Sequence, residues 1–166
     1  MQDVILHLCT RIIVRRVVDP SSCIRDAELK DSDEIARLCI ELGYPVSPAA
    51  MATRISALRE SDSHYIAVAC GPQSRLLGWV AAEHRLLLES GERVEIVGLV
   101  IDRSTRRKGV GKALVSAVEC WTAARGFAKI FVRSNIVRSD AHHFYEGIGY
   151  QRTKTQHAYT KTVSAA

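Results

Sequence analysis

The segment 94–125 constrains the fold of this chain more than any other part of its sequence. An apolar run of mostly β-branched residues ends at Ile101, and a basic turn containing Gly109 and Gly111 follows. Apolar residues then recur at helical spacing as far as Arg125. Glycine has no Cβ atom, so the backbone at such a turn can bend sharply and approach a ligand closely. The first amides of a helix lack intrahelical acceptors and lie at the positive end of its dipole. The segment therefore predicts a strand, loop and helix that bind a phosphate group.

The spacing of the turn excludes two common phosphate motifs. A Walker loop needs a glycine where this chain has Arg106, and the dinucleotide fingerprint needs its third glycine where this chain has Leu114. The pattern that remains is Arg106-x-x-Gly109-x-Gly111. A basic helix start on an unrelated α/β protein would give the same pattern, so this motif alone leaves that alternative open.

Composition limits the class of ligand. The chain has 166 residues, 47% hydrophobic and 25% charged, which suits one globular domain. No apolar run approaches the roughly 20 residues of a membrane span, so we expect no membrane partner. The net charge of +5 suits a polyanion. The basic residues gather at 103–112 and near Arg138 without interleaved aromatic residues, which favours a small phosphorylated cofactor over nucleic acid.

Cysteine and histidine usage indicates neither a metal site nor a disulfide framework. The five cysteines are odd in number and scattered, and no histidine pair has a ligand spacing. We therefore expect no metal, and a reducing, cytoplasmic compartment. Residues 1–21 lack the basic start and Ala-x-Ala site of a secretory signal and are expected to be an N-terminal extension of open role. Residues 22–166 are expected to form a single domain.

Strand-like and helix-like patterns alternate along the rest of the chain. Ser32 can cap a helix that stops at Gly43, and Pro48 suits the first turn of the next helix. Short connections between the following strands predict an antiparallel meander, and a right-handed crossover through the helix predicts one parallel pair. The expected strands are 24–29, 65–70, 76–83, 94–101 and 129–133, with one or two more within 150–163, and the later helices are 111–125 and 140–146.

A second motif identifies a resemblance. The segment 141–150 reads Ala-x-x-Phe-Tyr-x-x-x-Gly-Tyr, and it follows the strand that comes after the phosphate-binding helix. Both motifs, in this order, resemble the GNAT superfamily of acetyl-CoA-dependent N-acyltransferases, and the resemblance covers roughly residues 24–163. It implies an α/β (α+β) fold with a mixed, mostly antiparallel sheet of six to seven strands. It also implies a V-shaped split between the fourth and fifth strands and about four flanking helices.

The resemblance implies direct transfer of the acetyl group of acetyl-CoA to a primary amine in a ternary complex. Tyr145 would protonate the departing thiolate, because a phenol is still protonated at neutral pH. Glu95 would be the general base, with its pKa raised by partial burial. Alternation along the strand does not decide which face Glu95 occupies, and an exposed strand-edge glutamate and a packing tyrosine are the structural alternatives.

The resemblance also assigns binding residues. Asn135 would face the cofactor, although Arg138 stands where the family often has an asparagine. Tyr44, in the loop after the first helix, and Glu83, as an anchor for a cation, would bind the acceptor. The residues expected to bind acetyl-CoA are Leu99, Val100, Ile101, Arg106, Arg107, Lys108, Gly109, Val110, Gly111, Lys112, Asn135 and Arg138.

Other functions remain open from sequence alone. A non-catalytic acetyl-CoA sensor or regulatory module would carry the same cofactor motif, and a basic nucleic-acid-binding protein would show steeply salt-dependent affinity. The acceptor is expected to be an amine on a small molecule or a protein. Dimers are frequent in the family, so the resemblance is also compatible with a homodimer.

Overall fold

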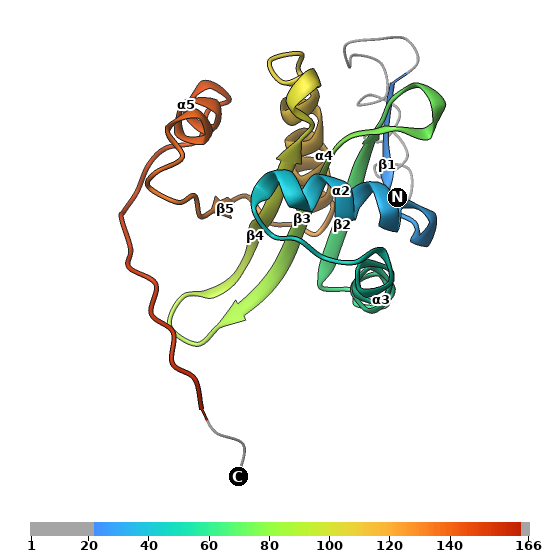
Figure 1. Cartoon of the computed structure of the whole chain (residues 1–166). Coiled ribbons are helices and arrows are strands. Elements are labelled where there is room, and N and C mark those ends of the chain that lie inside the picture. The colour runs from blue at the N-terminus through green and yellow to red at the C-terminus, as the bar shows by residue number, and fades with distance from the viewer. Residues whose placement is uncertain (1–21, 164–166) are drawn as a thin grey trace. The chain divides into compact units, whose positions relative to one another are not determined.

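Five strands form one mixed sheet in the computed structural model, which describes residues 22–163 (Figure 1). The sheet order is β1-β2-β3-β4-β5, with antiparallel pairing from β1 to β4 and parallel pairing of β4 with β5. The predicted meander and parallel crossover are therefore confirmed. The strands are β1 Cys23–Asp26, β2 His64–Cys70, β3 Leu76–Leu87, β4 Gly91–Ile101 and β5 Ile130–Val132.

Residues 22–163 form four α-helices, as expected. Gly43 ends the first of them in the left-handed conformation at φ +91°, and the Ser47 hydroxyl caps the second by accepting from the Ala50 amide at 3.2 Å. The helices are α2 Ser32–Leu42, α3 Pro48–Arg59, α4 Val110–Ala124 and α5 Ser139–Gly147, and the 3-10 turns are η1 Leu29–Asp31, η2 Pro72–Ser74 and η3 Arg103–Thr105.

The described residues divide into two compact units, the first ending at Arg133 and the second beginning at Ser134. The first unit holds the whole sheet with α2, α3 and α4, and the second holds α5 and the segment that follows it. The N-terminal extension expected at 1–21 lies outside the described residues.

Helices α2 and α4 cover opposite faces of the sheet (Figure 1). Trp79 of β3 packs against a buried cluster that includes Ile35 and Leu38 of α2. The preceding residue, Gly78, lies against α4, because a Cβ added there would be 3.2 Å from the Leu114 side chain. Adjacent residues of a strand point to opposite faces, so Trp79 marks the α2 face and Gly78 the α4 face.

A β-bulge in β4 decides the orientation of Glu95. Ala81 and Ala82 of β3 pair with Gly98 and Ile96 of β4, so Val97 is the extra residue. Glu95 pairs with Glu83, which alternates in β3 onto the same face as Trp79. The bulge therefore places Glu95 on the α2 face, which simple alternation could not establish.

Strands β4 and β5 pair over only three residues. The last pair is Ile96 with Val132, and among the described residues, residues 98–101 pair only with β3. The β4 backbone groups that face away from β3 are thus without a strand partner beyond Ile96. The expected split between the fourth and fifth strands requires this arrangement.

Two sequence predictions about strands are wrong. The sheet has five strands rather than six or seven, because no strand forms within 150–163. Its repeated threonines suit a strand, but Ala158, Tyr159 and Val163 are its only apolar residues after Tyr150, and residues 151–163 are all exposed. A strand needs a partner for its backbone groups, and local sequence does not supply one. Conversely, β3 and β4 extend through a polar hairpin to Leu87 and Gly91, beyond the predicted ends at 83 and 94.

Candidate active site

The loop between β4 and α4 has an uncommon backbone conformation. Gly109, the residue before α4, has φ +84°, and Arg107 has φ +61° although it carries a side chain. No side chain caps α4 at Gly109. The first amides of α4 are therefore left for a ligand or solvent, which is the arrangement that anion sites at helix starts require.

Cationic side chains surround this helix start. Val110 and Gly111 are buried and fix the first turn against the sheet, whereas the cationic residues of the loop are exposed. The exposed cations are Arg106, Arg107, Lys108 and Lys112. The structure thus brings together the predicted phosphate-binding residues, with Leu99, Val100 and Ile101 leading into them along β4.

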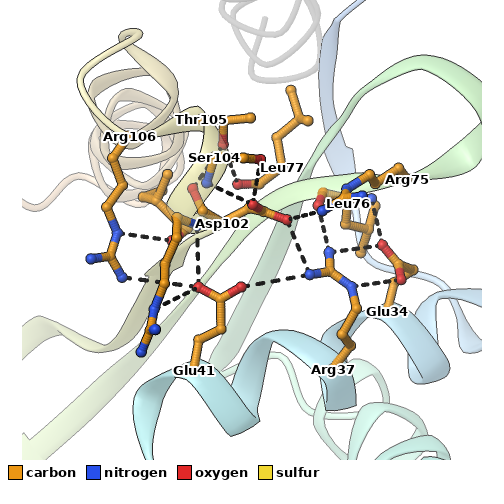
Figure 2. Close-up of polar contacts among 12 residues, drawn as sticks. Glu34, Arg37, Glu41, Arg75, Leu76, Leu77, Asp102, Ser104, Thr105 and Arg106 are labelled. Atoms are coloured by element: carbon orange, nitrogen blue, oxygen red, sulfur yellow. Dashed lines mark hydrogen bonds and ion pairs between the residues drawn. The ribbon is translucent and has the colours of Figure 1, made fainter.

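Asp102, which sequence reasoning missed, anchors the loop (Figure 2). It is 2% exposed, and its Oδ1 accepts from the Ser104 amide at 2.9 Å and the Ser104 hydroxyl at 2.6 Å. Its Oδ2 accepts from Arg37 at 3.0 Å and from Arg75 at 2.9 Å. Burial alone would raise the pKa of this carboxyl, but the hydrogen bonds from Ser104, Arg75 and Arg37 hold the pKa well below its usual range.

Arg37 connects this carboxylate to α2 and β3. Its guanidinium binds both carboxylate oxygens of Glu34, at 2.8 and 3.0 Å, and donates to the Leu76 carbonyl at 3.1 Å (Figure 2). Glu34 in turn accepts from the Leu76 amide at 3.0 Å. The sequence signal for Asp102 was an Asp-x-Ser turn directly after the strand. The arginine partners of Asp102 lie 27 and 65 residues away in the sequence, so no local pattern predicts them.

Arg106, the first candidate for the diphosphate, rests against α2 and β4. Its Nε donates to the Ile101 carbonyl at 3.4 Å, and its guanidinium lies 4.0 Å from Glu41 (Figure 2). Glu41 also accepts from the Arg103 amide at 3.2 Å. Arg106 remains exposed, so these contacts hold it beside the loop without removing it from solvent.

Glu95 is buried among three arginines. It is 1% exposed, and its carboxylate lies 2.5 Å from Arg133, 3.0 Å from Arg93 and 3.3 Å from Arg85. Burial acts to raise the pKa of Glu95, but the charges and hydrogen bonds of Arg133 and Arg93 outweigh burial and lower the pKa below its ordinary value. The expectation of a raised pKa is therefore wrong. A carboxylate held ionised by guanidinium groups accepts a proton poorly.

The two predicted acceptor-binding residues have different surroundings. Glu83 stands opposite Glu95 on the same face and lies 3.8 Å from the Arg85 guanidinium, so its charge is partly compensated. Tyr44 is 68% exposed in the loop between α2 and α3. The register of β3 and β4 thus places Glu83 beside Glu95.

In the second unit, Tyr145 lies on α5 with its ring 5.1 Å from Phe144 and 5.5 Å from Tyr150, centroid to centroid. Burial raises the pKa of Tyr145 to about 12, so the phenol is protonated at neutral pH. Asn135 Oδ1 accepts from the Val137 amide at 3.2 Å, and Arg138 immediately precedes α5. The asparagine oxygen is thus used within its own turn.

Metal ligation and membrane insertion find no support among residues 22–163. No group of three His, Cys, Asp or Glu side chains in this range could hold a metal ion. No helix in the same range is both long and apolar enough to cross a membrane.

Comparison with known protein families identifies the family of this chain. The sequence profile of the Acetyltransferase (GNAT) family matches residues 30–150. The chain belongs to this family. The match begins just before α2 and ends just after α5, so it includes both motifs.

Two curated relatives match part of the chain. N-acetylaspartate synthetase of Danio rerio is 30% identical over 88 residues, which are 53% of this chain and 30% of the synthetase. YhdJ of Bacillus subtilis, described as an uncharacterized N-acetyltransferase, is 29% identical over 92 residues, which are 55% of this chain and 64% of that protein. The match thus spans less than two thirds of either relative.

Solved GNAT structures share the fold. Among them, AAC(6')-Iy in complex with the bisubstrate analog CoA-S-monomethyl-acetylneamine has a TM-score of 0.75 at 18% identity, covering 86% of this chain and 99% of that chain. At this identity the likeness shows a common fold.

The loop residues of this GNAT chain fit a coenzyme A moiety. Coenzyme A presents a diphosphate and a further phosphate, which need oriented N–H donors and cations. The start of α4 without a side-chain cap supplies the donors, and the exposed cations of 106–112 supply the charge.

Proposed function

We propose that this GNAT chain is an N-acetyltransferase that passes the acetyl group of acetyl-CoA directly to a primary amine in a ternary complex. The observation that carries the proposal is the position of the loop at 102–109. It follows the part of β4 that lies beyond the last pair with β5 and leads into a helix start without a side-chain cap. A diphosphate at that helix start and an extended arm along the β4 edge would place a thioester at the split.

The binding roles follow from charge and backbone geometry. The amides that open α4, together with Arg106, Arg107, Lys108 and Lys112, would bind the phosphates. The backbone of residues 99–101 has no strand partner on the β5 side among the described residues, although the Ile101 carbonyl accepts from Arg106, and it would hydrogen-bond the pantetheine arm.

Two proton transfers accompany the acyl transfer. The amine nitrogen forms a bond to the acetyl carbon as the carbon–sulfur bond breaks, and the sulfur leaves with the electron pair. Tyr145 would give its proton to this thiolate, as the family motif implies, and its high pKa keeps that proton available.

Glu95 receives a different role from the one that the sequence suggests. Because three guanidinium groups bind its carboxylate, Glu95 is proposed as a positioning residue for them rather than as the general base. The amine would then attack in its neutral form, after its ammonium has lost a proton to water. The nitrogen would release a second proton to water as the amide forms, and a proton from solvent would restore the Tyr145 phenol. The kcat/KM for an amine should rise with pH up to the pKa of that amine. If the pH profile of kcat/KM instead shows an inflection between about pH 5 and 7 that is the same for different amines, a side chain of the protein acts as the general base.

The deciding experiment pairs binding with turnover. Isothermal titration should show acetyl-CoA binding, and the release of coenzyme A thiol should depend on an added amine. Tyr145→Phe should lower kcat about 100-fold or more with unchanged acetyl-CoA affinity. Tyr159→Phe is the matched control, since Tyr159 is 88% exposed in the same unit, and it should change neither quantity. A folded protein that does not bind acetyl-CoA would refute the proposal.

The alternative is an acetyl-CoA-binding sensor or regulatory module without catalysis. The arginine-bound Glu95 favours it, because that carboxylate is poorly suited to proton removal. Binding of acetyl-CoA without turnover of any amine would select this alternative.

The acceptor is proposed to be an amine on a small molecule or a protein. The names of the similar proteins offer two small-molecule chemistries, the carboxylate-bearing amine of N-acetylaspartate and the polyamine neamine. A cytoplasmic, homodimeric enzyme would be compatible with either acceptor.

A further inference from the structure

Three arginines on adjacent strands converge on one face of the sheet beside the split. Arg85 of β3 pairs directly with Arg93 of β4, and both alternate onto the face of Glu95. Arg133 follows β5, and its Nε reaches the same carboxylate. We call Arg85, Arg93 and Arg133 the arginine cluster. The last pair of β4 with β5 is one residue beyond Glu95, so the cluster lies where the two strands separate.

The cluster has more hydrogen-bond donors and more positive charge than its carboxylates satisfy. A guanidinium has five N–H donors, and each arginine gives Glu95 a single hydrogen bond. Glu83, 3.8 Å from Arg85, is the other acidic side chain on this face of the hairpin that contacts the cluster. Three positive charges against two negative charges leave a net charge of +1.

The surplus donors are accessible on Arg133 and Arg85. The side chain of Arg133 is 64% exposed and that of Arg85 is 31% exposed. Arg93 is 23% exposed, and its guanidinium lies 4.9 Å from the centroid of the Phe131 ring, which fixes it in place. Arg133 and Arg85 therefore present more of their charge to solvent than Arg93 does.

The buried Glu95 explains why the arginines stay together. Three guanidinium groups would repel one another without a shared anion, and a carboxylate at 1% exposure is costly to bury unless it has such partners. Glu95 thus holds the guanidinium groups of the arginine cluster in fixed positions before any ligand binds. Fixed guanidinium forks bind carboxylates through paired hydrogen bonds.

We propose that the acceptor of this enzyme is an amine that also carries a carboxylate, which Arg133 and Arg85 bind. This inference rests on the proposed acetyl transfer and specifies its substrate class. The carboxylate would be anchored next to the split, with the amine directed at the thioester. A polycationic acceptor is disfavoured, because it would meet the same positive charges.

Matched amine pairs test the substrate class. Glycine against glycinamide, and L-aspartate against L-aspartic acid diamide, differ in the carboxylate groups, and spermidine represents a polycation. Because the amide and the acid of a pair differ in amine pKa, their rates are compared per neutral amine. On that basis we expect kcat/KM to be at least tenfold higher for the acid of a pair than for its amide, and spermidine to be the poorest acceptor. Equal rates within each pair, with acetyl-CoA binding intact, would overturn the inference and leave the proposed function standing.

Variants locate the effect. Arg133→Gln should raise KM at least tenfold for the carboxylate-bearing amine and leave the amide unchanged, whereas Arg133→Lys should recover part of the loss. Arg59→Gln is the matched control, an exposed arginine of α3 outside the cluster, and should change neither substrate. An Arg133→Gln loss that is equal for acid and amide would show a merely structural role and overturn the inference. Thermal unfolding reports whether each variant is folded.

Direct binding gives a readout that is independent of turnover. With coenzyme A present, succinate should raise the melting temperature of the wild type more than succinamide does, and Arg133→Gln should remove the difference. No difference in the wild type would overturn the inference. A protein that binds succinate but not coenzyme A would instead refute the proposed function.

Discussion

Gly109 shows how one residue sets the geometry of the proposed phosphate site. Its φ of +84° is accessible to glycine at little cost but strained for residues with a Cβ atom. Arg107 accepts the same strain at φ +61°, two residues earlier. Strained backbone of this kind persists where the surroundings hold it, and here the buried first turn of α4 does so.

Substitution of Gly109 tests this backbone requirement. Gly109→Ala should weaken acetyl-CoA binding at least tenfold, because the loop must change its φ or carry strain of about 1 kcal/mol. Gly126 provides a matched control at the other end of α4, with φ +81° and open space around an added Cβ. Gly126→Ala should destabilise the protein similarly and leave the affinity unchanged. Titration calorimetry and thermal unfolding measure the two effects, and equal affinities in both variants would contradict the assignment.

At the level of secondary-structure elements, the Asp102 network joins three parts of the first unit. Arg37 brings in α2, Arg75 precedes β3, and Ser104 belongs to the loop. The loop also donates from the Asp102 amide to the Leu77 carbonyl at 2.9 Å. The polar network therefore couples the position of the proposed phosphate loop to the helix that covers the sheet.

Asp102→Asn should be destabilising in a pH-dependent way. The folded-state pKa of Asp102 lies below its unfolded value, so its contribution is present above about pH 4 and is lost as the pH falls through the folded pKa. At pH 7 the variant should lose about 2 kcal/mol, toward the low end for buried ion pairs because Arg37 and Arg75 are partly exposed.

The difference from the wild type should shrink steadily as the pH falls below about 4. Urea unfolding at a series of pH values measures it, with the exposed Asp62→Asn as the control. A constant difference across that range would show that the Asp102 charge is not the cause.

At the scale of the whole molecule, the net charge of +5 is concentrated rather than spread. The loop at 103–112 carries one group of cations and the arginine cluster another. The first group has Glu41 as an acidic neighbour and the second has Glu83 and Glu95. Two small, partly compensated groups of cations of this kind suit small anions better than a long polyanion.

Salt dependence distinguishes these ligands. Between 50 and 200 mM salt, acetyl-CoA affinity should fall by about tenfold or less, since few phosphates are contacted. A protein that binds six to ten nucleic-acid phosphates loses about 10³–10⁵ in affinity over the same range. Titrations of acetyl-CoA and of a short DNA duplex at both salt concentrations measure the two responses. Tight DNA binding at 50 mM with a steep salt slope would contradict the small-cofactor assignment.

The sequence by itself determined the order of elements, the family and the phosphate loop, because these depend on local patterns. Glycine at a turn, apolar residues at helical spacing, and the segment 141–150 each carry their signal within a few residues. The helix ends at Gly43 and Gly126 were likewise readable, since each glycine adopts the left-handed conformation that ends a helix.

Only the tertiary structure decided the surroundings of Glu95 and Asp102. The bulge at Val97 set the face of Glu95, and Arg133 and Arg93 then lowered its pKa against the expectation from burial. The partners of Asp102 come from distant parts of the chain, and the segment 151–163 remains outside the sheet despite its strand-like composition. Charge and pairing act through space, so the neighbours in the folded chain, rather than those in the sequence, determine them.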